Sequence, residues 1–324
     1  MRLDERIGRR VKLRDLNILL AVVQWRSMAR AAEQLAVSQP VVSKAISDLE
    51  HVLGVPLLDR SRRGVDPTPY GKALLSRGVA VFDELRQAVK ELEFLADPTM
   101  GEVRIAAANA MIVSLLPVVI ARIYCRHPKF FIQIKDTMAG ATLYAELRER
   151  RVDFVVGRIL QPLHDKDLTA EILFDDPLFV VAGRQNPLAR KRSIKLADLI
   201  DQPWIMPPAE TAGGLIRQTF RDAGLSPPEP VIVSSSLSMY FELLNEGPLL
   251  AMMPRSVLVF APARHTIKVL PVKLPIKSRP VGIVTLQGRT LSPAAQLFIQ
   301  TVREVVRPLT GKDQPPRRRA DRLG

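Results

Sequence analysis

A row of small polar side chains recurs at four-residue intervals near the start of the chain: Gln39, Ser43 and Ser47. Residues spaced in this way share one face of a helix. Pro40 and Lys44 flank the row. Gln and Lys side chains can hydrogen-bond the edges of DNA bases, and small neighbours allow a helix to sink into the major groove. An ordinary solvated helix face would carry the same pattern, and the spacing alone leaves both interpretations open.

The segments around this row predict helices that would hold it in place. Apolar residues at helical spacing predict a buried stripe on a first helix: Leu13, Leu16, Leu20 and Val23. Ser27 can cap a second helix, and after a turn at 36–38 Ser38 can cap a third. The third helix has its own core face: Val42, Ala45, Ile46 and Leu49. A helix, a three-residue turn and a helix with a polar outer face are the layout of a helix-turn-helix.

A basic stretch follows this unit, between Val55 and Gly71. It carries three arginines just before Gly64: Arg60, Arg62 and Arg63. Glycine and the prolines that follow are typical of the turns that bound a hairpin. We therefore predict a hairpin wing with a basic tip, suited to contact with phosphates or to insertion into a minor groove.

A long helix is predicted next, from the cap at Thr68 and Pro69 to the stop at Asp97 and Pro98. Small and apolar residues in it alternate spacings of four and three: Gly71, Leu75, Gly78, Phe82, Leu85, Val89 and Leu92. Such a heptad seam is typical of a dimerising helix. Packing of the helix on its own domain is the alternative, which the charged residues on its other faces disfavour.

Beyond Gly101 the pattern changes to alternating strands and helices, which indicates an α/β fold. Strands are predicted at 103–107, 131–135, 152–156, 178–181, 231–233 and 249–252. Helices are predicted at 115–124, 143–150, 215–223, 238–244 and 293–306.

Composition narrows the choice of partners. The chain has 324 residues, enough for two or three domains, and a net charge of +14, which favours nucleic acid or an anionic membrane surface. General solubility is the plainer explanation of this charge. Residues 1–77 contain 14 basic and 8 acidic residues, so the charge gathers where DNA contact is predicted. Cys125 is the single cysteine, which excludes an internal disulfide, and without a signal-peptide pattern we expect a cytoplasmic protein.

At these residues the chain resembles the LysR-type transcriptional regulators. The segment MARAAEQLAVSQPVVSKAISDLEHVLGVPLLDRSRRGVDPTPYG, residues 28–71, matches the pattern of that family: paired alanines, a Gln-Pro opening of the reading helix, Leu49-Glu50 at its end and a closing Thr-Pro-x-Gly. Leu58-Asp59 replaces the usual Phe-Glu, and Arg26 stands where Gly is common. The sequence of this segment is most similar to that of subgroups linked to sugar uptake or aromatic-acid catabolism.

The resemblance implies four parts. We expect a winged helix-turn-helix DNA-binding domain at 1–71, a linker (dimerisation) helix at 72–98, an effector-binding regulatory domain at 99–310 and a basic disordered tail at 311–324. The regulatory domain would resemble a periplasmic binding protein, with two α/β lobes between which the chain crosses twice. Partners would be double-stranded DNA with an interrupted palindromic operator, a small-molecule effector and further copies of the chain in a homodimer or homotetramer. A regulator of this kind can also contact RNA polymerase, whereas no membrane partner and no cofactor are expected.

The resemblance also implies the site residues. Those expected to contact bases are Gln39, Pro40, Ser43 and Lys44, and Ser47 is also expected to bind DNA. Those expected to contact backbone or minor groove are Arg30, Arg60, Arg62 and Arg63. Lys44 stands where the family often has Arg. The effector pocket between the lobes would be formed by Asn109, Met111, Thr137, Met138, Arg158, Glu210, Thr211, Ser235 and Ser236. Arg158 favours an anion and Glu210 favours a neutral polyol, so a sugar and an aromatic or carboxylic acid both remain open.

Two other function classes are disfavoured by the sequence. An enzyme does not fit because the four histidines show no metal-ligand spacing and no nucleophile elbow, P-loop or dinucleotide motif is present. A solute-binding protein would suit the two lobes, but the front 90 residues and the lack of a signal peptide oppose it. The sequence therefore predicts a DNA-binding regulator with no catalytic residue and no metal.

Overall fold

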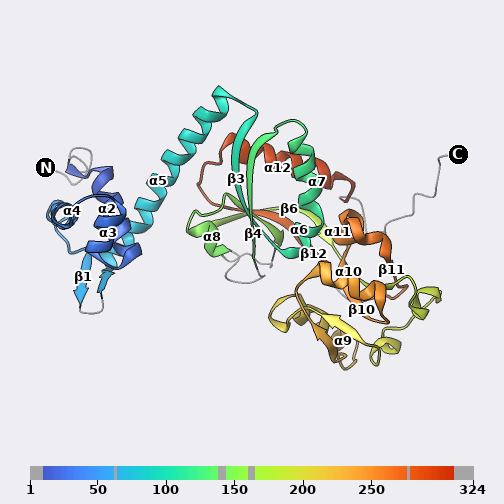
Figure 1. Ribbon diagram of the computed structural model, residues 1–324. Helices are drawn as coiled ribbons and strands as arrows, with labels where there is room; N and C mark the ends of the chain where they lie inside the picture. The colour runs from blue at the N-terminus through green and yellow to red at the C-terminus, as the bar shows by residue number, and fades with distance from the viewer. Residues whose placement is uncertain (1–9, 62–63, 138–143, 160–164, 276–277, 310–324) are drawn as a thin grey trace. The chain divides into compact units, whose positions relative to one another are not determined.

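The computed structural model describes residues 10–61, 64–137, 144–159, 165–275 and 278–309. The chain forms two compact units, Met1–Ala88 and Val89–Gly324 (Figure 1). The predicted tail at 311–324 lies outside the described residues.

The first unit contains the predicted helix-turn-helix: α2 (Leu13–Trp25), α3 (Met28–Gln34) and α4 (Gln39–Leu53). The Ser27 side chain caps α3 by accepting a hydrogen bond from the Arg30 amide. The predicted core face of α4 is confirmed, because Val42, Ala45, Ile46 and Leu49 are all buried. The buried stripe predicted for α2 is wrong at Leu13, which is exposed. The apolar residues of α2 that are buried are Leu16, Ile18, Leu19 and Val22.

A two-stranded antiparallel hairpin follows, formed by β1 (Leu58–Ser61) and β2 (Gly64–Pro67). Oε1 of Glu50 accepts hydrogen bonds from the backbone amides of Leu57 and Leu58, which joins the end of α4 to the start of the hairpin. Arg26 adopts a left-handed conformation with φ of 49°, the reason glycine suits this position. Its guanidinium forms an exposed ion pair of 2.8 Å with Asp66 of β2.

The long helix α5 spans Pro69–Ala96 and begins at the predicted cap, where the Gly71 amide donates to Oγ1 of Thr68. Its predicted seam is divided in two. A Cβ at Gly71 would lie 2.0 Å from the Leu57 carbonyl oxygen, so the start of the seam packs within the first unit. Farther along, apolar side chains are exposed at helical spacing: Val81, Leu85, Val89, Leu92 and Leu95.

The first lobe of the second unit is built on a five-stranded sheet of order β4-β3-β5-β12-β6. Its strands are β3 (Met100–Ala107), β4 (Lys129–Asp136), β5 (Phe154–Arg158), β6 (Leu168–Asp176) and β12 (Arg279–Leu286). Its helices are α6 (Asn109–Val113), α7 (Leu115–Tyr124), α8 (Ala145–Arg148) and α12 (Pro293–Val306). Alternate residues of β3 pack into different cores, Val103 and Ile105 with α7 and α12 and Ala106 with α8, so helices cover both faces.

The second lobe has a sheet of order β11-β7-β10-β8-β9. Its strands are β7 (Leu178–Gly183), β8 (Trp204–Met206), β9 (Pro230–Val233), β10 (Leu250–Pro254) and β11 (Ile267–Val269), and its helices are α9 (Gly214–Asp222), α10 (Leu237–Glu246) and α11 (Arg255–Phe260). Short helical turns lie at Pro187–Arg190, Leu196–Leu199, Ala209–Gly213, Pro262–Thr266 and Arg307–Leu309. Helix α9 covers one face of the sheet, whereas α10 and α11 cover the other (Figure 1).

The chain passes between the lobes twice, from β6 into β7 and from β11 back into β12. The predicted two-lobed α/β architecture behind a winged helix-turn-helix is therefore confirmed. In the first lobe β3 is parallel to β4 and β5, and β12 is antiparallel to β5 and β6. The carboxyl ends of β3, β4, β5 and β6 and the start of β12 consequently meet at one edge, where ligands of open α/β sheets commonly bind.

Candidate functional site

The outer face of α4 carries the polar row predicted to read DNA. Gln39, Pro40, Lys44 and Ser47 are exposed and Ser43 is half-buried, on the side of the helix away from its buried core face. Pro40 lies in the first turn, where its missing amide hydrogen leaves no intrahelical bond unmade. The helix therefore presents short polar side chains and one basic group in a form that fits a groove.

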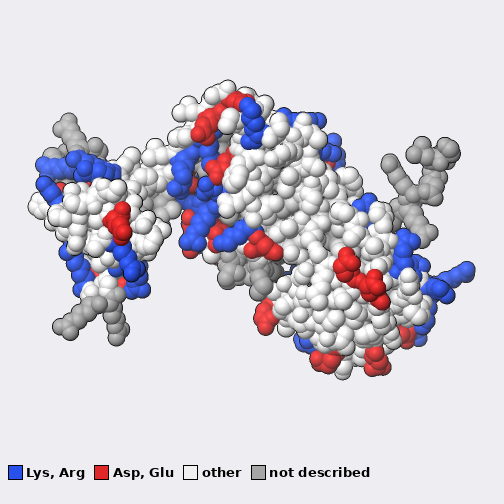
Figure 2. Space-filling model, in the orientation of Figure 1, with Lys and Arg blue, Asp and Glu red and all other residues white. Residues whose placement is uncertain are grey.

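Basic residues are also exposed on the neighbouring elements of this unit. Arg30 is exposed in the first turn of α3, and Arg60 is exposed in β1 of the hairpin. Arg62 and Arg63 lie outside the described residues. Figure 2 shows Lys and Arg side chains on both sides of the hairpin in the first unit. This distribution of charge suits a phosphate backbone.

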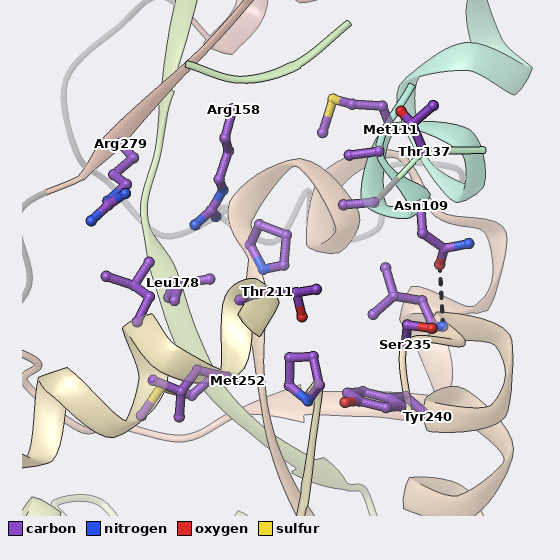
Figure 3. Close-up of a pocket in the computed structure, with 18 of the residues that line it drawn as sticks. Asn109, Met111, Thr137, Arg158, Leu178, Thr211, Ser235, Tyr240, Met252 and Arg279 are labelled. Carbon is purple, nitrogen blue, oxygen red and sulfur yellow. Dashed lines mark hydrogen bonds between the residues drawn. The ribbon is translucent and has the colours of Figure 1, made fainter. Parts of the chain in front are cut away.

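A cavity of about 550 Å³ opens between the two lobes of the second unit, at the edge where the strands of the first lobe end. Six of the nine residues predicted to form an effector pocket line it: Asn109, Met111, Thr137, Arg158, Thr211 and Ser235 (Figure 3). The volume falls in the range of pockets that hold small organic ligands.

The other three predicted residues do not line the described cavity. Glu210 is exposed in the turn Ala209–Gly213, beside Thr211, which does line it. Ser236 caps α10 by accepting a hydrogen bond from the Met239 amide. Met138 lies outside the described residues. Two neighbouring residues of a loop can point in different directions, and the sequence carries no signal that shows which of them faces the cavity.

Asn109 links the lobes at one wall of the cavity. Its Nδ2 donates to Oδ2 of Asp136 at 3.2 Å, and its Oδ1 accepts from the Leu237 amide of α10 at 3.3 Å (Figure 3). Tyr240 of α10 lines the same wall, and its hydroxyl donates to the Ser234 carbonyl. Burial raises the pKa of Tyr240, which keeps the phenol protonated and able to donate.

Arg158 lies at the opposite wall, at the end of β5. Its Nη2 lies 3.7 Å from Oδ2 of Asp176 and donates to the Asp176 carbonyl oxygen at 3.0 Å. The Asp176 carboxylate is fully buried and also accepts hydrogen bonds from the backbone and the hydroxyl of Ser256 in α11. Burial lowers the pKa of the Arg158 guanidinium and raises that of the Asp176 carboxyl. The pair joins the cavity wall to the first crossing between the lobes.

Arg279, at the start of β12, also lines the cavity but was not predicted from the sequence. Figure 3 shows it on the same side of the cavity as Arg158. The strand at 279–286 was not predicted, although its run PVGIVTL is rich in β-branched residues and carried a usable signal.

Two family models match the chain. The model of the bacterial regulatory helix-turn-helix protein, lysR family, matches residues 13–72, and that of the LysR substrate binding domain matches residues 96–307. The second match alone spans well over half of the chain. This protein is a LysR-type transcriptional regulator.

Curated LysR-type relatives match along nearly the whole chain. The transcriptional regulator GbpR of Azospirillum brasilense is 31% identical over 91% of this chain and 86% of its own length. GalR of Pseudomonas putida is 30% identical over 90% of this chain and 74% of its own length. Both are named as transcriptional regulators, so the assignment of this chain to the DNA-binding regulators is confirmed.

Solved LysR-type structures share the fold. A full-length variant of OxyR from Pseudomonas aeruginosa aligns with a TM-score of 0.62 at 23% identity, over 94% of this chain and 99% of that one. CbnR complexed with its target DNA aligns with a TM-score of 0.51 at 22% identity, over 92% of this chain and 100% of that one.

Neither a metal-binding cluster nor a membrane-spanning helix is found among the described residues. The described part of the chain holds no group of three or more His, Cys, Asp or Glu side chains that could bind a metal ion. A membrane-crossing helix would need a longer apolar run than any helix within the described ranges provides.

Proposed function

We propose that a small molecule bound in the inter-lobe cavity switches this regulator between two arrangements on its operator. The observation that carries the proposal is a cavity with residues from both lobes in its lining, Thr137 and Arg158 from the first and Thr211 and Ser235 from the second. A ligand that contacts both lobes binds one arrangement of them better than another, which is the condition for switching.

At the operator, we assign base contacts to Gln39, Pro40, Ser43, Lys44 and Ser47. Arg30, Arg60, Arg62 and Arg63 are assigned to the backbone or the minor groove. The exposure of the α4 row supports the first assignment, and the positions of Arg30 and Arg60 on the surface support the second. Lys44 carries a single rotatable ammonium group in place of the planar, two-pronged guanidinium of Arg, so it contributes less selectivity for guanine than Arg would.

The assembly we propose is a homodimer or homotetramer joined through the linker helix within 72–98. Exposed apolar residues at Val89, Leu92 and Leu95 support this role. Two-fold symmetry would then match an interrupted palindrome. Because chromosomal DNA is the partner, the site of action is the cytoplasm, and contact with RNA polymerase belongs to the same proposal.

The test of the switch uses two cavity variants, Thr137→Val and Ser235→Ala. Each removes a hydroxyl from one lobe, so the effector response should weaken while operator affinity without effector stays near that of the wild type. Thr285→Val is the matched control, because Thr285 is half-buried at the far end of β12 and does not line the cavity.

The measurement is a titration of candidate metabolites against operator-bound protein, followed by footprint or DNA bend. A wild-type response from both cavity variants would show that the effector binds elsewhere. Such a result would leave the DNA-binding assignment intact, because that assignment rests on the family and on α4.

A further inference from the structure

We propose that the cavity binds an organic acid, whose carboxylate is held between the guanidinium groups of Arg158 and Arg279. The inference rests on the proposed function of the cavity as the effector site and specifies the chemical class of its ligand. It also assigns Arg279 as the residue that sets this specificity.

Strand register brings the two arginines together. Arg158 at the end of β5 is paired with Val281 of β12, and Arg279 lies two residues before Val281 on the same strand. Residues paired across an antiparallel ladder, and residues two apart along a strand, share one face of the sheet. Asp176 of β6 is paired with Arg279 and therefore shares that face too. The ends of β5 and β6 and the start of β12 thus present two guanidinium groups and one carboxylate, whereas Asp136 at the end of β4 also lines the cavity and accepts a hydrogen bond from Asn109.

Around the two arginines the charges do not balance. The Asp176 carboxylate is fully buried and is already engaged by Arg158 and by both donors of Ser256. Arg279 is exposed, its backbone is paired with Asp176 in the sheet, and within the described ranges its guanidinium makes no hydrogen bond or ion pair. Burial and the positive charge of Arg279 both lower the pKa of Arg158, so the two guanidinium groups repel each other. A ligand anion between them would relieve that repulsion and supply a partner for Arg279.

The rest of the lining favours a compact apolar body over a sugar. Eleven of the nineteen lining residues are alanine, leucine, isoleucine, methionine or proline. Hydroxyl groups of a polyol that face these apolar residues would have no hydrogen-bond partner. Glu210, the residue that favoured a neutral polyol, is exposed and does not line the cavity. Polar groups at the far wall, Asn109 and Ser235, can accept or donate to a hydroxyl on the ligand (Figure 3).

The experiment measures binding to the full-length protein by calorimetry with matched acid and amide probes. The pairs are 4-hydroxybenzoate with 4-hydroxybenzamide and hexanoate with hexanamide, and glucose is the polyol probe. We expect at least one acid to bind, and its amide to bind about tenfold or more weakly because the neutral group loses the charge-assisted hydrogen bonds. Arg279→Gln should weaken the acid by a similar factor and remove the preference for acid over amide.

The matched control is Arg122→Gln, which removes one positive charge from the same lobe at an exposed position of α7 outside the cavity. It should leave acid binding unchanged. Arg279 is chosen over Arg158 because loss of Arg158 would leave the buried Asp176 without its cation. Arg279→Lys tests the geometry, since a single ammonium cannot form the paired hydrogen bonds of a guanidinium.

Three outcomes would overturn the inference. They are amides or glucose binding as tightly as the acids, Arg279→Gln retaining acid binding, and no acid binding at about 10 mM, where a ligand of millimolar Kd would occupy most sites. The proposed function fails separately. If an acid binds through Arg279 but leaves the operator complex unchanged, the ligand class holds and the switch does not. If a neutral compound binds and changes the operator complex, the switch holds and the ligand class does not.

Discussion

The Leu57 amide donates a 2.7 Å hydrogen bond to Oε1 of Glu50, and this bond ties the start of the hairpin to the end of α4. The Leu58 amide donates to the same oxygen at 3.3 Å. One carboxylate therefore fixes the hairpin relative to the helix that carries the proposed reading face.

From this bond we predict that Glu50→Ala loosens the hairpin. Two half-buried amides would lose their acceptor, at a cost of about 1–3 kcal/mol. Hydrogen exchange at residues 57–58 should speed up by a matching factor, measured by mass spectrometry of the full-length protein. Glu50→Gln is the control, because it keeps an acceptor oxygen and should remain close to the wild type. Equal protection in all three proteins would show that the carboxylate does not hold the hairpin.

The second prediction concerns the outer face of α4. Ser43→Ala or Lys44→Ala should weaken binding to the operator by about 1–3 kcal/mol while much of the binding to random DNA remains. Fluorescence anisotropy with both DNAs at one salt concentration measures the difference. If affinity for the two DNAs falls equally, these side chains contact phosphate or nothing, and they do not read bases.

The third prediction concerns the exposed apolar residues of α5. Val89 is 53% exposed, so Val89→Asp puts a charge on the proposed interface without disturbing a core of the chain itself. Sedimentation should show dissociation at micromolar concentration, whereas Val89→Leu should stay assembled. Phe82→Asp should also dissociate the protein, but Phe82 is half-buried and its loss disturbs local packing as well. A monomeric wild type would refute the dimerising role of the helix.

The fourth prediction compares a buried with an exposed ion pair. Arg289 lies 3.1 Å from Asp153, and each side chain is 2% exposed. Arg289→Met should destabilise the first lobe by about 3–5 kcal/mol because the Asp153 carboxylate stays buried without its cation. Arg303→Met breaks an exposed pair with Glu171 at 2.7 Å and should cost no more than about 1 kcal/mol. Urea unfolding followed by circular dichroism gives both values, and equal costs would contradict the argument.

Periodic patterns predicted most of the fold. Helices α7 and α12 have the predicted bounds. Each carries a continuous apolar stripe, and its first residues carry a sequence signal typical of the start of a helix. Strands β6, β8, β11 and β12 and helices α6 and α11 were not predicted. Two of these strands have only three residues, and a short apolar run does not distinguish a strand from a buried helical turn. At Arg26 the family's preference for glycine was a sequence signal, and the structure shows the left-handed conformation that accounts for it.

The cavity was partly predictable for a physical reason. Polar residues that follow buried parallel strands meet at one edge of a sheet, and this rule led to Asn109, Thr137 and Arg158. It did not lead to Arg279, which is the first residue of an antiparallel strand far later in the chain. The direction of a loop side chain such as that of Glu210 depends on local dihedral angles, and no periodicity encodes it.

The positions of two aromatic residues and one thiol make lobe closure measurable by light. Trp204 is buried in the second lobe, in an edge-to-face contact with Phe220, and Cys125 is exposed at the end of α7 in the first lobe. The sequence contains one other tryptophan, Trp25 in α2, and no other cysteine. In a Trp25→Phe protein labelled at Cys125, energy transfer from the indole to the dye would follow the separation of the lobes during a ligand titration.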